Sequence, residues 1–153
     1  MGEMVQRAKE LAYRAHAGQV DKAGRPYIEH VARVAAACAD DPEAEAVAWL
    51  HDVLEDCKGP VDEQVIGAVG MELYVQVLHL TRDNDMPQDS YYRYIRNSSI
   101  ALRVKLADIA DNADESRLAL LDEKTAARLR RKYAKAREAL TATPSSMEGE
   151  RSE

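Results

Sequence analysis

AWLHDVLEDC, residues 48–57, has the pattern of a core helix in which four polar side chains stand among apolar ones. The polar members are His51, Asp52, Glu55 and Asp56. Ordinary buried helices exclude such groups, because burying unpaired charge in an apolar environment is unfavourable. A metal ion with an anionic substrate is the first candidate for offsetting that cost.

The segments around this stretch also have helical patterns. Apolar residues recur at three- and four-residue spacing, Gly18 follows the first predicted helix as a stop, and Pro26 suits the first turn of the second. No pair of alternating β-branched runs joined by a hairpin turn appears in the sequence. Predicted helices cover residues 3–16, 26–39, 40–56, 61–69, 72–81, 89–97, 98–114 and 122–140.

We therefore expect an all-α, compact, single-domain fold. A chain of 153 residues, 46% of them hydrophobic and 31% charged, is long enough for one core and too short for two comfortable ones. The expected domain covers residues 1–141. Residues 142–153 are small and polar and include a proline, so we expect a disordered tail there.

Charge and composition limit the partners of the chain. A formal net charge of −6 argues against broad binding of DNA, RNA or acidic membranes, where affinity comes from Lys and Arg, but it allows a small phosphate ligand. No apolar stretch approaches the roughly 20 residues that cross a bilayer. Cys38 and Cys57 form no disulfide framework, which suits a reducing compartment. We expect a soluble, cytoplasmic protein, and the sequence leaves a homo-oligomer open.

Candidate metal ligands lie on three separate segments. His30 lies in the second predicted helix, His51 and Asp52 are adjacent in the third, and Asp108 lies in the segment VKLADIADN. Two imidazoles and two carboxylates suit a divalent transition ion such as Mn²⁺, Fe²⁺ or Zn²⁺, which can activate a water molecule. Glu55 follows His51 by four residues, so on a continuous helix it shares that face and can move a proton.

Each of these residues also has an ordinary structural interpretation. A single histidine such as His30 is more often a half-buried, hydrogen-bonded side chain than a ligand. Glu55 and Asp56 can end a helix at the surface, and Asp108 and Asp111 can be solvated charges. The combination of a histidine, an adjacent His-Asp pair and a later aspartate on three predicted helices favours the metal site.

The motifs that carry these residues resemble those of a known family. AHAGQ (15–19), GRPYIEH (24–30), LHDVLEDC (50–57) and VKLADIADN (104–112) occur in that order. The His and Asp set resembles the metal signature of the HD phosphohydrolase superfamily. More narrowly, the motifs resemble the hydrolase domain of RelA/SpoT-type proteins and the stand-alone small alarmone hydrolases, over about residues 5–140.

The resemblance implies a reaction and a set of catalytic residues. That family hydrolyses the 3′-pyrophosphate from guanosine tetra- or pentaphosphate (ppGpp or pppGpp) and uses one Mn²⁺ ion. The matching positions imply that the metal ligands are His30, His51, Asp52 and Asp108. They imply that proton transfer and water positioning belong to Glu55 and Asp56.

The resemblance also implies substrate contacts, with one departure. Asn112 matches an asparagine that contacts the nucleoside, and Lys22 matches a loop lysine that meets the phosphates. The residue before that lysine is commonly an arginine that packs on guanine, but here it is Asp21. An acid facing a polyphosphate is unfavourable, and Arg25 in the same loop is the candidate substitute.

Two alternatives to ppGpp hydrolysis stay open at this point. The same metal centre can serve another nucleotide or phosphorylated metabolite, which Asp21 favours. A second alternative, of a different class, is a catalytically silent module that binds a nucleotide or a protein. The intact acid pair Glu55 and Asp56 speaks against the silent module, because binding alone needs neither acid.

Overall fold

The fold of the described residues is built from α-helices. A computed structural model describes residues 2–56, 61–82 and 85–142, and no strand occurs there beyond an isolated bridge between Val20 and Pro26. The predicted all-α fold is therefore confirmed. The helices are α1 (Gly2–Ala15), α2 (Tyr27–Ala37), α3 (Pro42–Leu50), α4 (Val53–Asp56), α5 (Val61–Val69), α6 (Met71–Leu80), α7 (Gln88–Arg96), α8 (Ser99–Asn112), α9 (Glu115–Leu118) and α10 (Glu123–Thr141).

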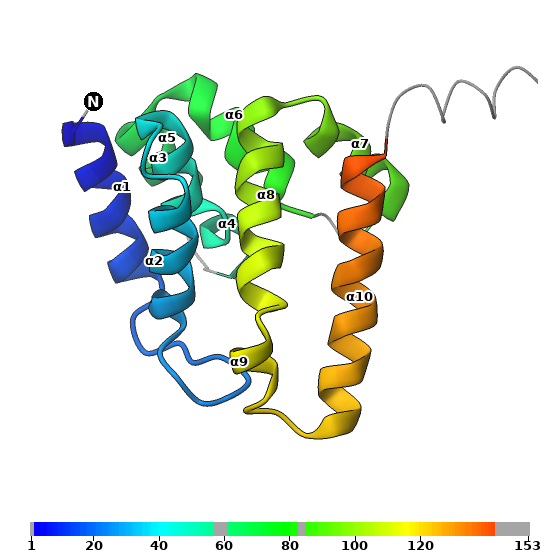
Figure 1. Cartoon of the computed structure of the whole chain (residues 1–153). Helices are drawn as coiled ribbons and strands as arrows, with labels where there is room; N and C mark the ends of the chain where they lie inside the picture. The colour runs from blue at the N-terminus through cyan, green and yellow to red at the C-terminus, as the bar shows by residue number, and fades with distance from the viewer. Residues whose placement is uncertain (1, 57–60, 83–84, 143–153) are drawn as a thin grey trace, which may run out of the picture.

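Helix α3 lies at the centre of the core, packed against α1, α2, α6 and α8 (Figure 1). Asp41 caps its first turn by accepting a hydrogen bond from the backbone N–H of Glu43, and Pro42 occupies the first helical position. The rest of the helix is apolar on nearly every side, which is typical of a fully buried helix. Its buried residues are Ala44, Ala46, Val47, Ala48, Trp49 and Leu50.

The predicted helix over residues 40–56 is interrupted in the structure. His51 and Asp52 form a turn between α3 and α4, and the N–H of His51 donates to the carbonyl of Ala48 at 3.4 Å, three residues earlier. The ring Nδ1 of His51 lies 2.7 Å from the same carbonyl oxygen. Because the helix ends there, the expectation that Glu55 shares a continuous helix face with His51 was wrong.

Helix α9 was not predicted from the sequence. Asp114 caps it by accepting a hydrogen bond from the N–H of Ser116, and Leu118 packs with Ala126 and Leu129 of α10 in a small cluster of its own. Figure 1 shows α9 at the same end of the molecule as the loop between α1 and α2. This end of the bundle therefore brings together segments that are far apart in the sequence.

Two sequence expectations fall largely outside the described residues. The predicted tail, apart from Ala142, and Cys57 lie there, so the division into a domain of residues 1–141 and a disordered tail stays a prediction. Among the residues that are described, no helix is long and apolar enough to span a bilayer.

Candidate metal centre

Four side chains from three segments converge in the interior. They are His30 of α2, His51 and Asp52 of the turn after α3, and Asp108 of α8, and each offers one ligand atom within 4.8 Å of all the others. His30 Nε2 lies 2.9 Å from Asp108 Oδ1, and His51 Nε2 lies 3.0 Å from Asp52 Oδ2. The sequence predicted this set, and the structure brings all four members together.

The chemistry of His51 fits a bound cation. Its Nδ1–H donates to the carbonyl of Ala48 at 2.7 Å, so its Nε2 presents a lone pair in the neutral ring. That Nε2 is buried, has no hydrogen-bond partner among the described residues, and faces carboxylate oxygens of Asp52 at 3.0 Å and Asp108 at 3.3 Å. The Nε2 lone pair and the carboxylate oxygens repel one another in a buried site, whereas a metal ion bound between them would accept electron density from all three side chains.

The protonation equilibria of the cluster also favour a positive charge at its centre. Burial opposes protonation of His51, but Asp52 and Asp108 outweigh burial and raise the pKa of His51 well above its usual range. Burial raises the pKa of Asp108, but Lys105, whose Nζ lies 3.0 Å from Oδ2, and the two histidines hold it well below its usual range. The carboxylates of Asp52 and Asp108 therefore favour a cation beside His51.

Metal loading is expected to stabilise the fold, because an ion that binds only the native state shifts unfolding by mass action. At a free Mn²⁺ concentration 100 times the dissociation constant, the gain is about 2.7 kcal/mol, which corresponds to a rise of about 5–10 °C in the melting temperature for a chain of this size. Thermal melts of chelator-treated protein across a Mn²⁺ series measure it. A melting temperature that does not change with Mn²⁺ would contradict the metal centre.

A pocket of about 840 Å³ opens beside the four-residue cluster, with Asp52 in its wall. The predicted residues Glu55, Lys22, Arg25 and Asn112 also line it. The side chain of Asp56 lies outside the described residues, although its backbone ends α4. The structure therefore places one predicted catalytic acid and all three predicted substrate residues around one pocket.

Asn112 and Glu55 have partners that bear on the site. The amide of Asn112 donates to Asp108 Oδ1 at 3.1 Å, so it also supports a candidate metal ligand. Glu55 Oε1 accepts a hydrogen bond from the backbone N–H of Arg82 at 3.2 Å, which fixes the direction of an otherwise exposed carboxylate. Both side chains are therefore positioned before a substrate binds.

Several further cations, not among the residues predicted from the sequence, lie in the same pocket. Arg33 of α2, Arg117 of α9 and Lys132 of α10 line it together with Lys22. Burial lowers the pKa of Lys132, and the positive charges of Lys22, Lys105 and Arg128 lower it further. No short motif marks these residues, since only folding brings α9 and α10 to the loop after α1. The pocket is locally positive although the whole chain is acidic.

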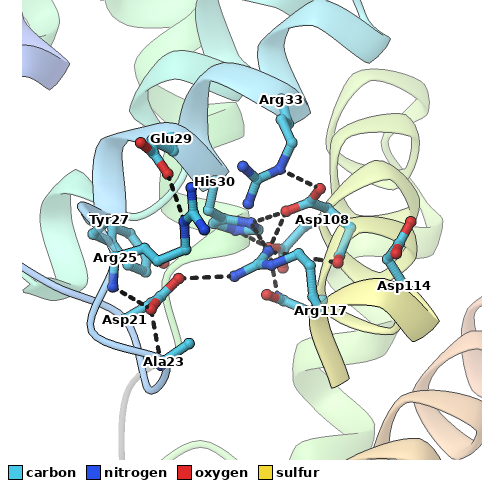
Figure 2. A network of polar contacts seen from close by, with 12 residues as sticks. Asp21, Ala23, Arg25, Tyr27, Glu29, His30, Arg33, Asp108, Asp114 and Arg117 are labelled. Atoms are coloured by element: carbon cyan, nitrogen blue, oxygen red, sulfur yellow. Dashed lines mark hydrogen bonds and ion pairs between the residues drawn. The ribbon is translucent and has the colours of Figure 1, made fainter. Parts of the chain in front are cut away.

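Asp21 does not face the pocket as an uncompensated acid. Its Oδ1 accepts hydrogen bonds from the backbone N–H groups of Ala23 at 2.9 Å and Arg25 at 3.0 Å, and its Oδ2 accepts one from Arg117 Nη2 at 3.2 Å (Figure 2). Gly24, with φ of 83°, completes the tight turn. Asp21 therefore shapes the loop and neutralises part of Arg117, which removes the reason for expecting it to repel a polyphosphate.

Replacing Asp21 is accordingly expected to impair the loop rather than to improve substrate use. The Asp21→Arg variant loses three hydrogen bonds and places the new arginine beside Arg117. The Asp21→Asn variant keeps the shape of the side chain but loses the negative charge that pairs with Arg117. For a charge-assisted hydrogen bond worth about 1.5–3 kcal/mol, we expect KM for a nucleotide substrate to rise about tenfold or more with a smaller effect on kcat. Steady-state kinetics measure both constants. Improved use of ppGpp by Asp21→Arg would contradict this role.

Known proteins resemble this chain in fold and, over a shorter stretch, in sequence. No protein-family model matches the chain. The solved structure of a metazoan orthologue of SpoT, a protein that hydrolyses ppGpp, superposes with a TM-score of 0.74 and 24% identity, over 92% of this chain and 86% of that one. The chain has the fold of this SpoT orthologue.

A curated relative shares a shorter stretch of sequence with this chain. The guanosine-3′,5′-bis(diphosphate) 3′-pyrophosphohydrolase of Vibrio cholerae serotype O1 is 43% identical over 58 residues, which is 36% of this chain. The chain spans 8% of the length of that relative. The chain thus resembles RelA/SpoT-type hydrolases in the order of its motifs and in its fold.

Proposed function

We propose that the chain is a Mn²⁺-dependent hydrolase that removes the 3′-pyrophosphate from ppGpp or pppGpp. The observation that carries the proposal is a cluster of four nitrogen and oxygen ligands beside a pocket lined by lysines and arginines. Such a site suits a polyanion whose phosphoryl group reacts at a metal. The likeness to a SpoT orthologue and to a bacterial 3′-pyrophosphohydrolase supports the choice of substrate.

The proposed ligands of the ion are His30, His51, Asp52 and Asp108, each of which offers one ligand atom. Mixed imidazole and carboxylate donors suit a transition ion such as Mn²⁺. When bound, a divalent ion lowers the pKa of a coordinated water and polarises a phosphoryl oxygen. The turn at His51 contributes two of the four ligands, which explains why the chain leaves the helix at that point.

Glu55 is the proposed group that moves the proton of the attacking water. Glu55 lines the pocket and follows Asp52 by three residues in the sequence. One of its carboxylate oxygens accepts a hydrogen bond from the backbone N–H of Arg82 at 3.2 Å. In the hydrolysis, the water oxygen bonds to the phosphorus atom attached to the ribose 3′-oxygen, that P–O bond breaks, and the leaving oxygen takes a proton. The same proton-transfer role is proposed for Asp56.

The cations of the pocket are proposed to hold the remaining phosphates. Lys22 and Arg25 come from the loop after α1, and Lys132 comes from α10. Asn112 is proposed to contact the nucleoside from the end of α8. Because lysine and arginine charges attract the substrate in both its ground and transition states, these contacts contribute mainly to affinity.

A substrate panel tests the proposal and its alternatives together. Chelator-treated protein, reloaded with Mn²⁺, Fe²⁺, Zn²⁺ or Mg²⁺, is incubated with ppGpp, pppGpp, dNTPs and nucleoside monophosphates. The proposal expects fastest turnover of ppGpp or pppGpp with Mn²⁺. Preference for another nucleotide would identify a different phosphohydrolase, and metal-dependent stabilisation with no turnover would identify a binding module. We also propose a cytoplasmic location for the protein.

A further inference from the structure

Asp111 contacts the one histidine of the cluster that lies on α2. Its Oδ2 lies 2.6 Å from His30 Nδ1, while Asp108 Oδ1 lies 2.9 Å from Nε2 of the same ring. Asp108 and Asp111 are three residues apart on α8, so both carboxylates reach the ring from one helix face. The histidine itself is buried, with 1% of its surface exposed.

The tautomer of His30 follows from these contacts. A lone pair on Nδ1 would face the carboxylate of Asp111 at 2.6 Å and be repelled, so Nδ1 carries the proton and donates it. Arg117 Nη1 also lies 3.3 Å from Nδ1, but the guanidinium is a donor and pairs with Asp111 Oδ2 instead. In the neutral ring, the Nε2 lone pair then points toward Asp108, and the proposed ion would relieve the repulsion between that lone pair and the carboxylate.

We infer that Asp111 is a positioning residue that orients His30 for metal binding. The inference rests on the proposed metal centre. A carboxylate that accepts the second N–H of a ligating imidazole fixes the ring and strengthens its donor nitrogen. Asp111 performs this task from outside the ligand set and is not needed to contact the ion.

Two arginines hold the Asp111 carboxylate in place. Arg33 Nε donates to Oδ1 of Asp111 at 2.7 Å, and Arg117 Nη1 donates to Oδ2. Burial opposes ionisation, but His30 and the two arginines outweigh it and lower the pKa of Asp111 to about 2. The two arginines therefore favour the ionised carboxylate, the form that accepts the N–H of His30. Through Arg117, it is also connected to Asp21 in the substrate loop.

Mn²⁺ affinity measured on unloaded protein tests the inference without an activity assay. Isothermal titration calorimetry gives the dissociation constant for wild type, Asp111→Asn, Asp111→Ala and the control Glu115→Gln. Glu115 also pairs with an arginine, Arg130 at 2.8 Å, but it lies on the surface away from the cluster. We expect Mn²⁺ affinity to fall about 10–100-fold in the Asp111 variants, more for alanine than for asparagine, and to be unchanged in the control.

Melting temperatures of the metal-free proteins separate orientation from a merely structural role. If Asp111 only stabilised the fold, its variants would melt earlier but bind Mn²⁺ as tightly as wild type, and that result would overturn the inference while leaving the proposed function intact. Wild type that binds no Mn²⁺ would overturn both. If neither Asp111 variant folds, Arg33→Gln serves as the test, because it removes one of the two arginine donors to Asp111. We expect it to bind Mn²⁺ more weakly than wild type. Unchanged Mn²⁺ binding would contradict the positioning role of Asp111.

Discussion

Replacing His51 with alanine is expected to abolish metal binding and hydrolysis together. The imidazole supplies a buried nitrogen that lies 3.0 Å from Asp52 and 3.3 Å from Asp108, so its removal leaves the two carboxylates facing one another. A metal ion supplies several kcal/mol of transition-state stabilisation, which corresponds to a loss of about 10³-fold or more in turnover. Asp108→Ala is expected to give the same phenotype.

Elemental analysis of purified protein and a turnover assay on ppGpp measure the two effects. His79→Ala is the matched control, because His79 stacks on Tyr94 away from the pocket and its loss should change neither quantity. A His51→Ala protein that keeps one ion per chain and near wild-type turnover would show that His51 is not a ligand.

Replacing Glu55 with glutamine is expected to give the opposite combination, with metal retained and turnover lost. The carboxylate is not among the four clustered ligands, yet it lines the same pocket. General acid–base groups contribute about 10²–10⁴-fold, so kcat should fall by that range while the Mn²⁺ stoichiometry stays the same. We expect Asp56→Asn to behave in the same way.

Glu72→Gln controls for loss of an exposed acid, since Glu72 lies in the first turn of α6 and outside the pocket. Single-turnover kinetics on metal-loaded protein separate the chemical step from product release. Near wild-type rates in both Glu55→Gln and Asp56→Asn would remove the proton-transfer role from this acid pair.

The helices were predictable from short-range apolar spacing, and the metal set was predictable because its residues stand in motifs that resemble those of a known family. Apolar spacing indicated nearly every helix, and the order of PYxxH, HDxxED and LAD placed His30, His51, Asp52 and Asp108 in one candidate site. The interruption at His51 was not predictable from periodicity. Apolar residues continue on both sides of it, and the contact between the ring and the Ala48 carbonyl becomes evident only in three dimensions.

The polar network around the site could not be predicted because no motif marks its partners, which are also distant in sequence. Asp21 and Arg117 are 96 residues apart, and His30 and Asp111 are 81 apart. Sequence alone presented Asp21 as an acid opposed to phosphate and Asp111 as a candidate surface charge. Both interpretations change once the short helix α9 carries Arg117 between the two aspartates.

The most direct test of the central claim is the identity of the products. ³¹P NMR follows ppGpp incubated with Mn²⁺-loaded protein, with chelator-treated protein and with His51→Ala. We expect the loaded wild type alone to convert ppGpp to GDP and pyrophosphate in equal amounts. Persistence of ppGpp with fully metal-loaded wild type, or release of orthophosphate in place of pyrophosphate, would contradict the account.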